Sequence, residues 1–169
     1  MVTWANLVTI GRILLIPVFV MILYLPLSYK GWVAALVFCA IAATDAVDGW
    51  LARKHKAVTE AGAVLDPLAD KLLVAAALIF LIGQGVEAWM AYVIIAREFL
   101  ITGLRILTKR KDVVHASFWG KLKTFSQMVG VVSVLIDFKY SWHLMLLATI
   151  LTLWSGFDYF WKVRKTLKI

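Results

Sequence analysis

Long apolar stretches of about 20 residues recur along this chain, and short polar segments separate them. A helix of about 20 residues is long enough to cross the hydrocarbon core of a bilayer. We expect six such helices, with the approximate ranges 7–27, 32–50, 68–82, 88–107, 118–136 and 143–160. With 63% hydrophobic residues and a mean hydropathy of +0.87, the composition excludes a soluble globular domain. The sequence therefore predicts an all-α integral membrane protein with six transmembrane helices, made of a single domain over residues 1–169.

The basic residues gather in alternate connections between the expected helices. They cluster at 53–56, at 109–111 and in the tail at 162–168, whereas the opposite connections offer little beyond Lys30 and Lys139. By the positive-inside rule, both termini and the connections that carry these cations are cytoplasmic. The net charge of +8 thus describes a basic membrane face directed at anionic lipid headgroups. No nucleic-acid-binding module is present in the sequence, and we expect no nucleic-acid partner.

The chain has ten acidic residues, and four of them are aspartates that lie within 26 residues, at the ends of two apolar stretches. Asp45 and Asp48 are three residues apart and Asp66 and Asp70 are four apart, so each pair shares one face of a helix. Ionised carboxylates this close together repel one another unless cations hold them. Oxygen ligands without His or Cys nearby favour Mg²⁺ or Mn²⁺, and two facing pairs can hold two ions about 3.5–4 Å apart. The spacing predicts a two-metal site at a membrane surface.

Small residues and one arginine accompany the first carboxylate pair. Gly49 and Ala52 continue its helix face with almost no side chain, which leaves room for a planar group such as a nucleobase. Arg53 carries a fork of donors that suits phosphate. Alternatively, the four acids form ordinary ion pairs at helix ends with the cations nearby. Four carboxylates at helical spacing, with small residues between them, favour the metal site over these ion pairs.

Two later segments carry charges within or beside apolar stretches. Arg97 and Glu98 lie inside the fourth stretch, and Arg105 follows Arg97 by eight residues, near the same helix face. Lys121 and Lys123 begin the fifth stretch, at the same membrane side as Arg105. Converging cations beside a metal site predict a pocket for an anionic second substrate. The alternative is that Arg97 pairs with Glu98 or Asp70, while the lysines extend to the headgroups.

The carboxylate motif resembles the signature of the CDP-alcohol phosphotransferase family. That signature reads Asp-x-x-Asp-Gly-x-x-Ala-Arg, eight residues, then Gly-x-x-x-Asp-x-x-x-Asp, and residues 45–53 and 62–70 fill every fixed position. Residues 97–105 (REFLITGLR) and 120–124 (GKLKT) are similar to the phosphatidylglycerophosphate synthase branch of this family, as are residues 6–13 (NLVTIGRI). The resemblance extends from about Asn6 to Lys123.

The resemblance implies six transmembrane helices in the inner cell membrane, usually in a homodimer, with the active site facing the cytoplasm. It implies transfer of the phosphatidyl group from CDP-diacylglycerol to sn-glycerol 3-phosphate, which gives phosphatidylglycerophosphate and CMP. Asp70 takes the role of the base that accepts the proton of the attacking hydroxyl. Together with the spacing, the resemblance assigns the metal ions to Asp45, Asp48, Asp66 and Asp70. It assigns the CDP group to Asn6, Thr9, Asp48, Gly49, Ala52, Arg53 and Gly62. It assigns the acceptor phosphate to Arg97, Arg105, Lys121 and Lys123.

Other functions stay open at this point. Within the family, the acceptor could be serine, inositol phosphate or a second phosphatidyl group such as phosphatidylglycerol. From other classes, the chain could be a divalent-cation transporter or a non-catalytic membrane scaffold. Against transport, the carboxylates cluster at one membrane face and the sequence offers no second cluster across the bilayer. Release of CMP that depends on CDP-diacylglycerol and a metal ion would distinguish an enzyme from a transporter and from a scaffold.

Overall fold

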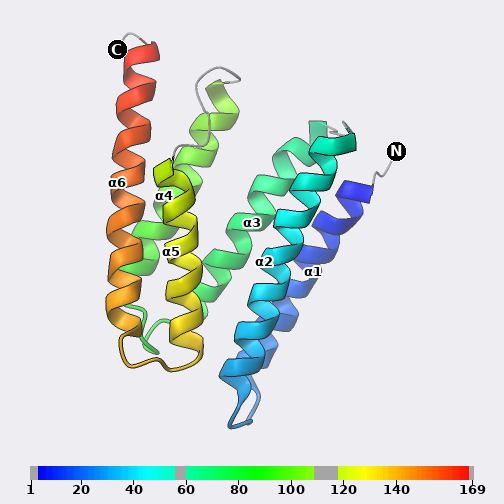
Figure 1. Cartoon of the computed structure of the whole chain (residues 1–169), viewed down its shortest axis with the longest axis vertical. Coiled ribbons are helices and arrows are strands. Elements are labelled where there is room, and N and C mark those ends of the chain that lie inside the picture. The colour runs from blue at the N-terminus through cyan, green and yellow to red at the C-terminus, as the bar shows by residue number, and fades with distance from the viewer. Residues whose placement is uncertain (1–3, 56–59, 109–117, 168–169) are drawn as a thin grey trace. The chain divides into compact units, whose positions relative to one another are not determined.

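The chain forms an all-helical structure. It is a computed structural model that describes the backbone of residues 4–55, 60–108 and 118–167, and the side chains of residue 69 and within 11–44, 71–104 and 119–161. The described residues form six α-helices and no β-strand (Figure 1). The helices are α1 (Trp4–Tyr24), α2 (Lys30–His55), α3 (Glu60–Phe80), α4 (Ala88–Thr108), α5 (Phe118–Leu135) and α6 (Ser141–Leu167).

The helix boundaries confirm the predicted all-α class and revise three of the predicted ranges. Helices α1, α4 and α5 begin and end within three residues of the expected positions. Helix α2 continues to His55, and α6 continues to Leu167. Helix α3 begins at Glu60, eight residues before the predicted start. Hydropathy placed these ends too far inside the helices because it follows apolar side chains, whereas the helical backbone continues through the charged residues.

Membrane-spanning character is clearest in α6. Among the described residues, one helical segment, Ser141–Trp161, is both long and apolar enough to cross a membrane, by length and composition alone. Three shorter apolar helical segments are Gly11–Tyr24, Lys30–Thr44 and Lys71–Phe80. Only 28% of the most apolar part of Ser141–Trp161 is buried inside the structure, so this segment differs from the mostly buried core helix of a soluble protein.

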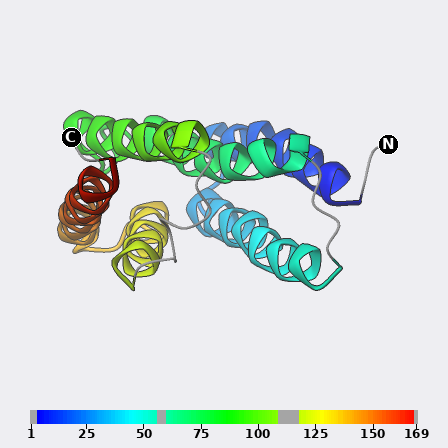
Figure 2. The ribbon, with the colours of Figure 1, turned by 90° about the horizontal axis from the view of Figure 1, so that it is seen from above.

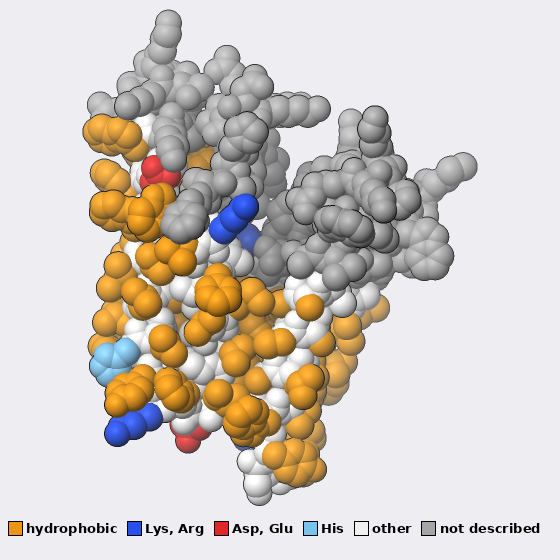
Figure 3. Space-filling view, viewed as in Figure 1, with side chains coloured by type: hydrophobic (Ala, Val, Ile, Leu, Met, Phe, Trp, Pro, Cys, Tyr) orange, Lys and Arg blue, Asp and Glu red, His pale blue; other side chains and the backbone are white. Residues whose placement is uncertain are grey.

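The outer surface of α6 is rich in large apolar side chains. Ile150, Leu153, Trp154, Phe157 and Phe160 are between 53% and 65% exposed. Figure 3 shows that apolar side chains also dominate the described surface on one face of the molecule, where charged side chains are few. Exposed apolar patches of this extent mark surfaces that meet a membrane or a partner protein.

The chain divides into two compact units, Met1–Phe80 and Leu81–Ile169. In the first unit, α1 packs against α2 and α3, and α2 also contacts α3. Its core is built around Phe19 and Phe38, whose ring centroids are 5.8 Å apart, together with the fully buried Ala34, Ala77 and Leu78. Small residues such as these alanines let neighbouring helices approach closely. The single domain over residues 1–169 stays a prediction.

In the second unit, α6 packs against both α4 and α5. Figures 1 and 2 show α5 and α6 as adjacent antiparallel helices joined by a short turn. Asp137 occupies this turn with a φ of 52°, a conformation that aspartate adopts more readily than most residues. The two helices approach closely at Gly130, where an added Cβ would lie 3.2 Å from Cε of Met145. As a result, the inward face of α6 is covered by α4 and α5.

Candidate active site

The carboxylate motif lies entirely on helices of the first unit. All of residues 45–53 belong to α2, and both Asp66 and Asp70 belong to α3. The helical spacing on which the metal-site prediction depends is therefore present in the backbone, and α2 and α3 contact each other. The side chains of these four aspartates lie outside the described residues, as do those of Gly49, Ala52, Arg53 and Gly62.

Three helix ends meet at one end of the first unit. Figure 1 shows the beginning of α1, the end of α2 and the beginning of α3 on the same side of this unit. The beginning of α1 contains Asn6 and Thr9, whose side chains are outside the described set. One turn after Thr9, Arg12 is only 4% exposed, although it was not predicted from the sequence as a site residue. Its signal in the sequence is a cation inside an otherwise apolar stretch.

A metal ion needs a cluster of ligands, and the described side chains contain no group of three or more His, Cys, Asp or Glu that could hold one. The predicted ligands Asp45, Asp48, Asp66 and Asp70 all fall outside that set. Their chemistry fits hard divalent cations, since carboxylates supply only oxygen. The two-metal site and its bound Mg²⁺ or Mn²⁺ stay predictions.

The cations predicted to bind the acceptor belong to the second unit, where two of them meet at one carboxylate. Glu98 on α4 and Lys123 on α5 are each only 5% exposed. Oε1 of Glu98 accepts a hydrogen bond from Nη1 of Arg97 at 3.2 Å and another from Nζ of Lys123. The ion pair between Arg97 and Glu98, one of the alternatives above, is thus present. Lys121 is exposed, and the side chain of Arg105 is outside the described residues.

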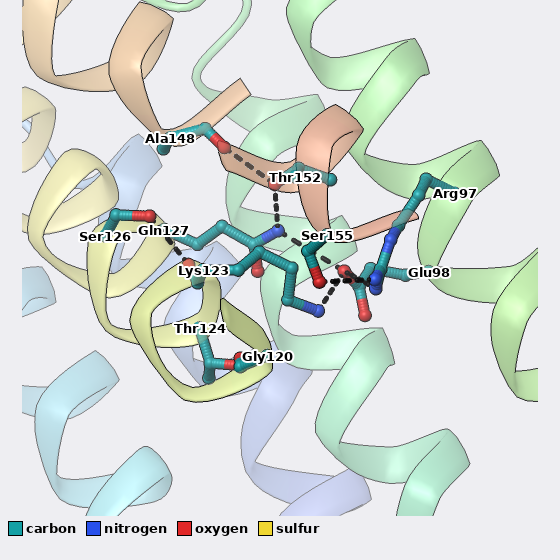
Figure 4. A network of polar contacts seen from close by, with 10 residues as sticks. All are labelled: Arg97, Glu98, Gly120, Lys123, Thr124, Ser126, Gln127, Ala148, Thr152 and Ser155. Carbon is teal, nitrogen blue, oxygen red and sulfur yellow. Dashed lines mark hydrogen bonds and ion pairs between the residues drawn. The ribbon is translucent and has the colours of Figure 1, made fainter. Parts of the chain in front are cut away.

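Polar side chains from α5 and α6 complete the surroundings of Glu98. Gln127 on α5 donates from Nε2 to Oε1 of Glu98 at 3.3 Å and to Oγ1 of Thr152 at 2.8 Å. Thr152 on α6 donates in turn to the carbonyl oxygen of Ala148. Nη2 of Arg97 donates to Oγ of Ser155 at 2.8 Å, so α4 is also hydrogen-bonded to α6 (Figure 4). We call this set the Glu98 network, and its members are Arg97, Glu98, Lys123, Gln127, Thr152 and Ser155.

Gln127, Thr152 and Ser155 were not predicted from the sequence. A signal for the two α6 residues exists, because Thr149, Thr152 and Ser155 recur at intervals of three within an apolar stretch. Residues at this spacing share one helix face. All three are at most 4% exposed, so this weakly polar stripe faces the interior of the second unit.

The Glu98 network holds two cationic side chains close together. Two cations and one carboxylate give Arg97, Lys123 and Glu98 a net charge of +1. The two cationic groups share one oxygen, so their nitrogens lie roughly 6 Å apart or closer, a distance that one phosphate can bridge.

Comparison with known proteins decides the family. Residues 2–154 match the CDP-alcohol phosphatidyltransferase family. This chain belongs to that family. The resemblance carried by the carboxylate motif is therefore confirmed. The matched region also continues beyond Lys123 and covers more than half of α6. Of the two α6 residues in the Glu98 network, Thr152 lies in this region and Ser155 follows it directly.

Individual members of the CDP-alcohol phosphatidyltransferase family are similar to this chain over nearly its whole length. A CDP-diacylglycerol–glycerol-3-phosphate 3-phosphatidyltransferase of Bacillus subtilis (strain 168) is 39% identical, and the match covers 95% of this chain and 96% of that protein. Proteins of the same name from Escherichia coli (strain K12) and Shigella flexneri serotype 5b are each 42% identical, with 91% of both chains covered.

Proposed function

We propose that this chain transfers the phosphatidyl group of CDP-diacylglycerol to sn-glycerol 3-phosphate, releasing CMP and forming phosphatidylglycerophosphate. The observation that carries this proposal is the similarity to relatives whose name states this reaction, at 39–42% identity over at least 91% of both chains. The Glu98 network supports the choice of acceptor, because buried cations suit an acceptor that brings its own phosphate.

The four aspartates of α2 and α3 are the proposed ligands of two divalent cations, Mg²⁺ or Mn²⁺. Four carboxylates on two contacting helices fit this role, since each pair shares one helix face and supplies only oxygen ligands. Bound there, the ions supply positive charge against the diphosphate and against the charge that develops on departing CMP.

The residues around the metal ligands then bind the donor and move one proton. Asp70 accepts the proton of the glycerol hydroxyl as its oxygen bonds to the phosphorus of the phosphatidyl group, and the bond from that phosphorus to CMP breaks. Gly49 and Ala52 leave space for the cytidine, and Arg53 holds a phosphate. Asp48 also contacts the CDP group, Asn6 and Thr9 contact its phosphates, and Gly62 lets the helices approach closely.

The acceptor phosphate binds to the cations of α4 and α5. Arg97 and Lys123 both form an ion pair with Glu98, which brings the two cations together. Arg105 lies two turns further along α4, and Lys121 lies in the first turn of α5. Because several cations bind a phosphate group, we expect glycerol 3-phosphate to be a better acceptor than glycerol, inositol or serine, which carry no phosphate.

Neutralising Arg105 should weaken use of the acceptor. We expect Arg105→Ala to lower kcat/KM for glycerol 3-phosphate by about ten- to a hundredfold through a higher KM, because a hydrogen bond between charged groups contributes about 1.5–3 kcal/mol. The KM for CDP-diacylglycerol should stay unchanged. Steady-state kinetics in both substrates measure this, with Lys139→Ala as the control, since Lys139 is an exposed cation in the α5–α6 turn. Unchanged glycerol 3-phosphate kinetics in Arg105→Ala would contradict the assignment of Arg105.

The proposed surroundings are the inner cell membrane, with six membrane-spanning helices, both termini and the active site on the cytoplasmic side, and a homodimer as the assembly. The exposed apolar surface of α6 supports membrane insertion, and the alternate placement of the cations supports the orientation.

This orientation predicts which positions a membrane-impermeant thiol reagent can reach from outside the cell. In a Cys39→Ala background, which removes the one native cysteine, a cysteine introduced at either terminus or within 109–111 should stay unlabelled in intact cells. A cysteine at position 139, in the α5–α6 turn, should be labelled. External labelling at the C-terminus would mean that the chain crosses the membrane an odd number of times.

A panel of acceptors tests the proposed function. Purified protein in detergent micelles with CDP-diacylglycerol and Mg²⁺ should convert glycerol 3-phosphate to phosphatidylglycerophosphate, identified by mass spectrometry. Glycerol, inositol and serine at the same concentration should give little product. If serine or phosphatidylglycerol were the better acceptor, the assignment to glycerol 3-phosphate would be wrong, although the family would stand.

A further inference from the structure

Arg97 is held on three sides in the second unit. Nη1 donates to Oε1 of Glu98 at 3.2 Å, and Nη2 donates to Oγ of Ser155 at 2.8 Å. Its aliphatic part crosses α6 at Gly156, where an added Cβ would lie 3.2 Å from Cγ of Arg97 and 3.3 Å from Nε. The side chain thus fills the space that Gly156 leaves by having no Cβ.

These contacts explain how the guanidinium of Arg97 reaches Glu98, the next residue of α4. Arg97 and Glu98 are consecutive, and consecutive residues of a helix do not face each other. The guanidinium of Arg97 therefore has to turn back along α4 to reach the carboxylate where Lys123 also binds. Ser155 supplies an acceptor for the turned guanidinium, and Gly156 gives the side chain room to pass. Figure 4 shows Arg97 directed between Glu98 and Ser155.

We propose that Ser155 and Gly156 of α6 are positioning residues for the acceptor phosphate. They hold the guanidinium of Arg97 beside the ammonium of Lys123, so that both cations bind one phosphate of the acceptor. The proposal rests on the proposed function and extends it, because it makes α6 part of the acceptor site. Since the two residues act through Arg97, they set the affinity for the acceptor and not the chemistry at the metal ions.

The first test is Gly156→Ala. Its added methyl group would lie 3.2 Å from Cγ of Arg97, so this side chain has to shift by a few tenths of an ångström. The shift weakens the placement of the guanidinium, and we expect the KM for glycerol 3-phosphate to rise about fivefold. The KM for CDP-diacylglycerol and the thermal midpoint should match the wild type. Alanine is the better helix former, so the helix itself is not weakened.

Gly130→Ala is the matched control. It adds the same methyl group to an interior helix glycine of the same unit, again with the nearest atom at 3.2 Å, but that atom is Cε of Met145. We expect Gly130→Ala to leave the KM for glycerol 3-phosphate within about twofold of the wild type. An equal rise in the two variants would mean that crowding in the helix packing, and not Arg97, causes the effect, and the proposal would be overturned.

Ser155→Ala tests the second contact without adding volume. It removes the acceptor of the Arg97 hydrogen bond, and we expect a rise of about fivefold in the KM for glycerol 3-phosphate. Ser133→Ala is its control, because Ser133 is equally buried, at 5% exposed against 4%, and its hydroxyl donates to the carbonyl oxygen of Gly130 on its own helix. A KM equal to that of Ser133→Ala would overturn the role of Ser155.

The inhibition constant of inorganic phosphate distinguishes a positioning role from a purely structural role, which would not change it. Phosphate should inhibit the wild type in competition with glycerol 3-phosphate, and its inhibition constant should rise in Gly156→Ala by the same factor as the KM. A parallel loss of CDP-diacylglycerol use and of thermal stability would instead identify a structural role and overturn the proposal. Failure of the proposed function is distinguishable, because the wild type itself would then form no phosphatidylglycerophosphate from glycerol 3-phosphate.

Discussion

Asp48→Asn should lower kcat by at least about 10²–10³-fold, the loss found when one preorganised group that stabilises the transition state is removed. Asparagine keeps the size and one carbonyl oxygen of the side chain but removes the negative charge that a divalent cation requires. Asp45→Asn and Asp66→Asn should have effects of the same order, because the four carboxylates act as one site. Initial rates of CMP release from CDP-diacylglycerol measure the loss.

The control for these variants is Asp137→Asn. This residue is exposed in the α5–α6 turn, and asparagine tolerates its φ of 52° as well as aspartate does. Asp137→Asn should therefore keep wild-type activity. If Asp48→Asn were as active as this control, Asp48 would have no role as a metal ligand.

Removal of divalent cations should have the other large effect. Excess EDTA should abolish CMP release, and Mg²⁺ or Mn²⁺ added beyond the chelator should restore it, since the proposed ligands are all carboxylate oxygens. The thermal midpoint should be measured in the same samples, to show that the chelated protein is still folded. Full activity in EDTA would contradict the two-metal site.

The order and number of the helices followed from the sequence because each apolar stretch is long enough to form one helix. The ends of three helices were not predicted correctly, and α3 shows the reason. Hydropathy begins this helix at residue 68, whereas the backbone begins it at Glu60, so that Asp66 lies inside it. Charged residues lower the hydropathy of a segment without preventing its backbone hydrogen bonds. For the candidate site this difference matters, since it puts both α3 carboxylates on one helix.

The carboxylate motif was visible in the sequence because its residues are close together along the chain. The Glu98 network was visible only in part. Arg97 and Glu98 were recognisable as charges in an apolar stretch, but Ser155 contacts Arg97 across 58 residues of sequence. Which helix packs against α4 is decided by tertiary structure, and serine and threonine are common enough in apolar helices that α6 gave only a weak signal.

The central claim is that this protein couples CMP release to transfer of the phosphatidyl group onto glycerol 3-phosphate. Counting both products in the same sample tests it most directly. Purified protein is given CDP-diacylglycerol, Mg²⁺ and radiolabelled glycerol 3-phosphate, and CMP and labelled phosphatidylglycerophosphate are measured over time. We predict equal amounts of the two products, and no CMP when glycerol 3-phosphate is left out. CMP released without labelled lipid, or no CMP with both substrates present, would contradict the account.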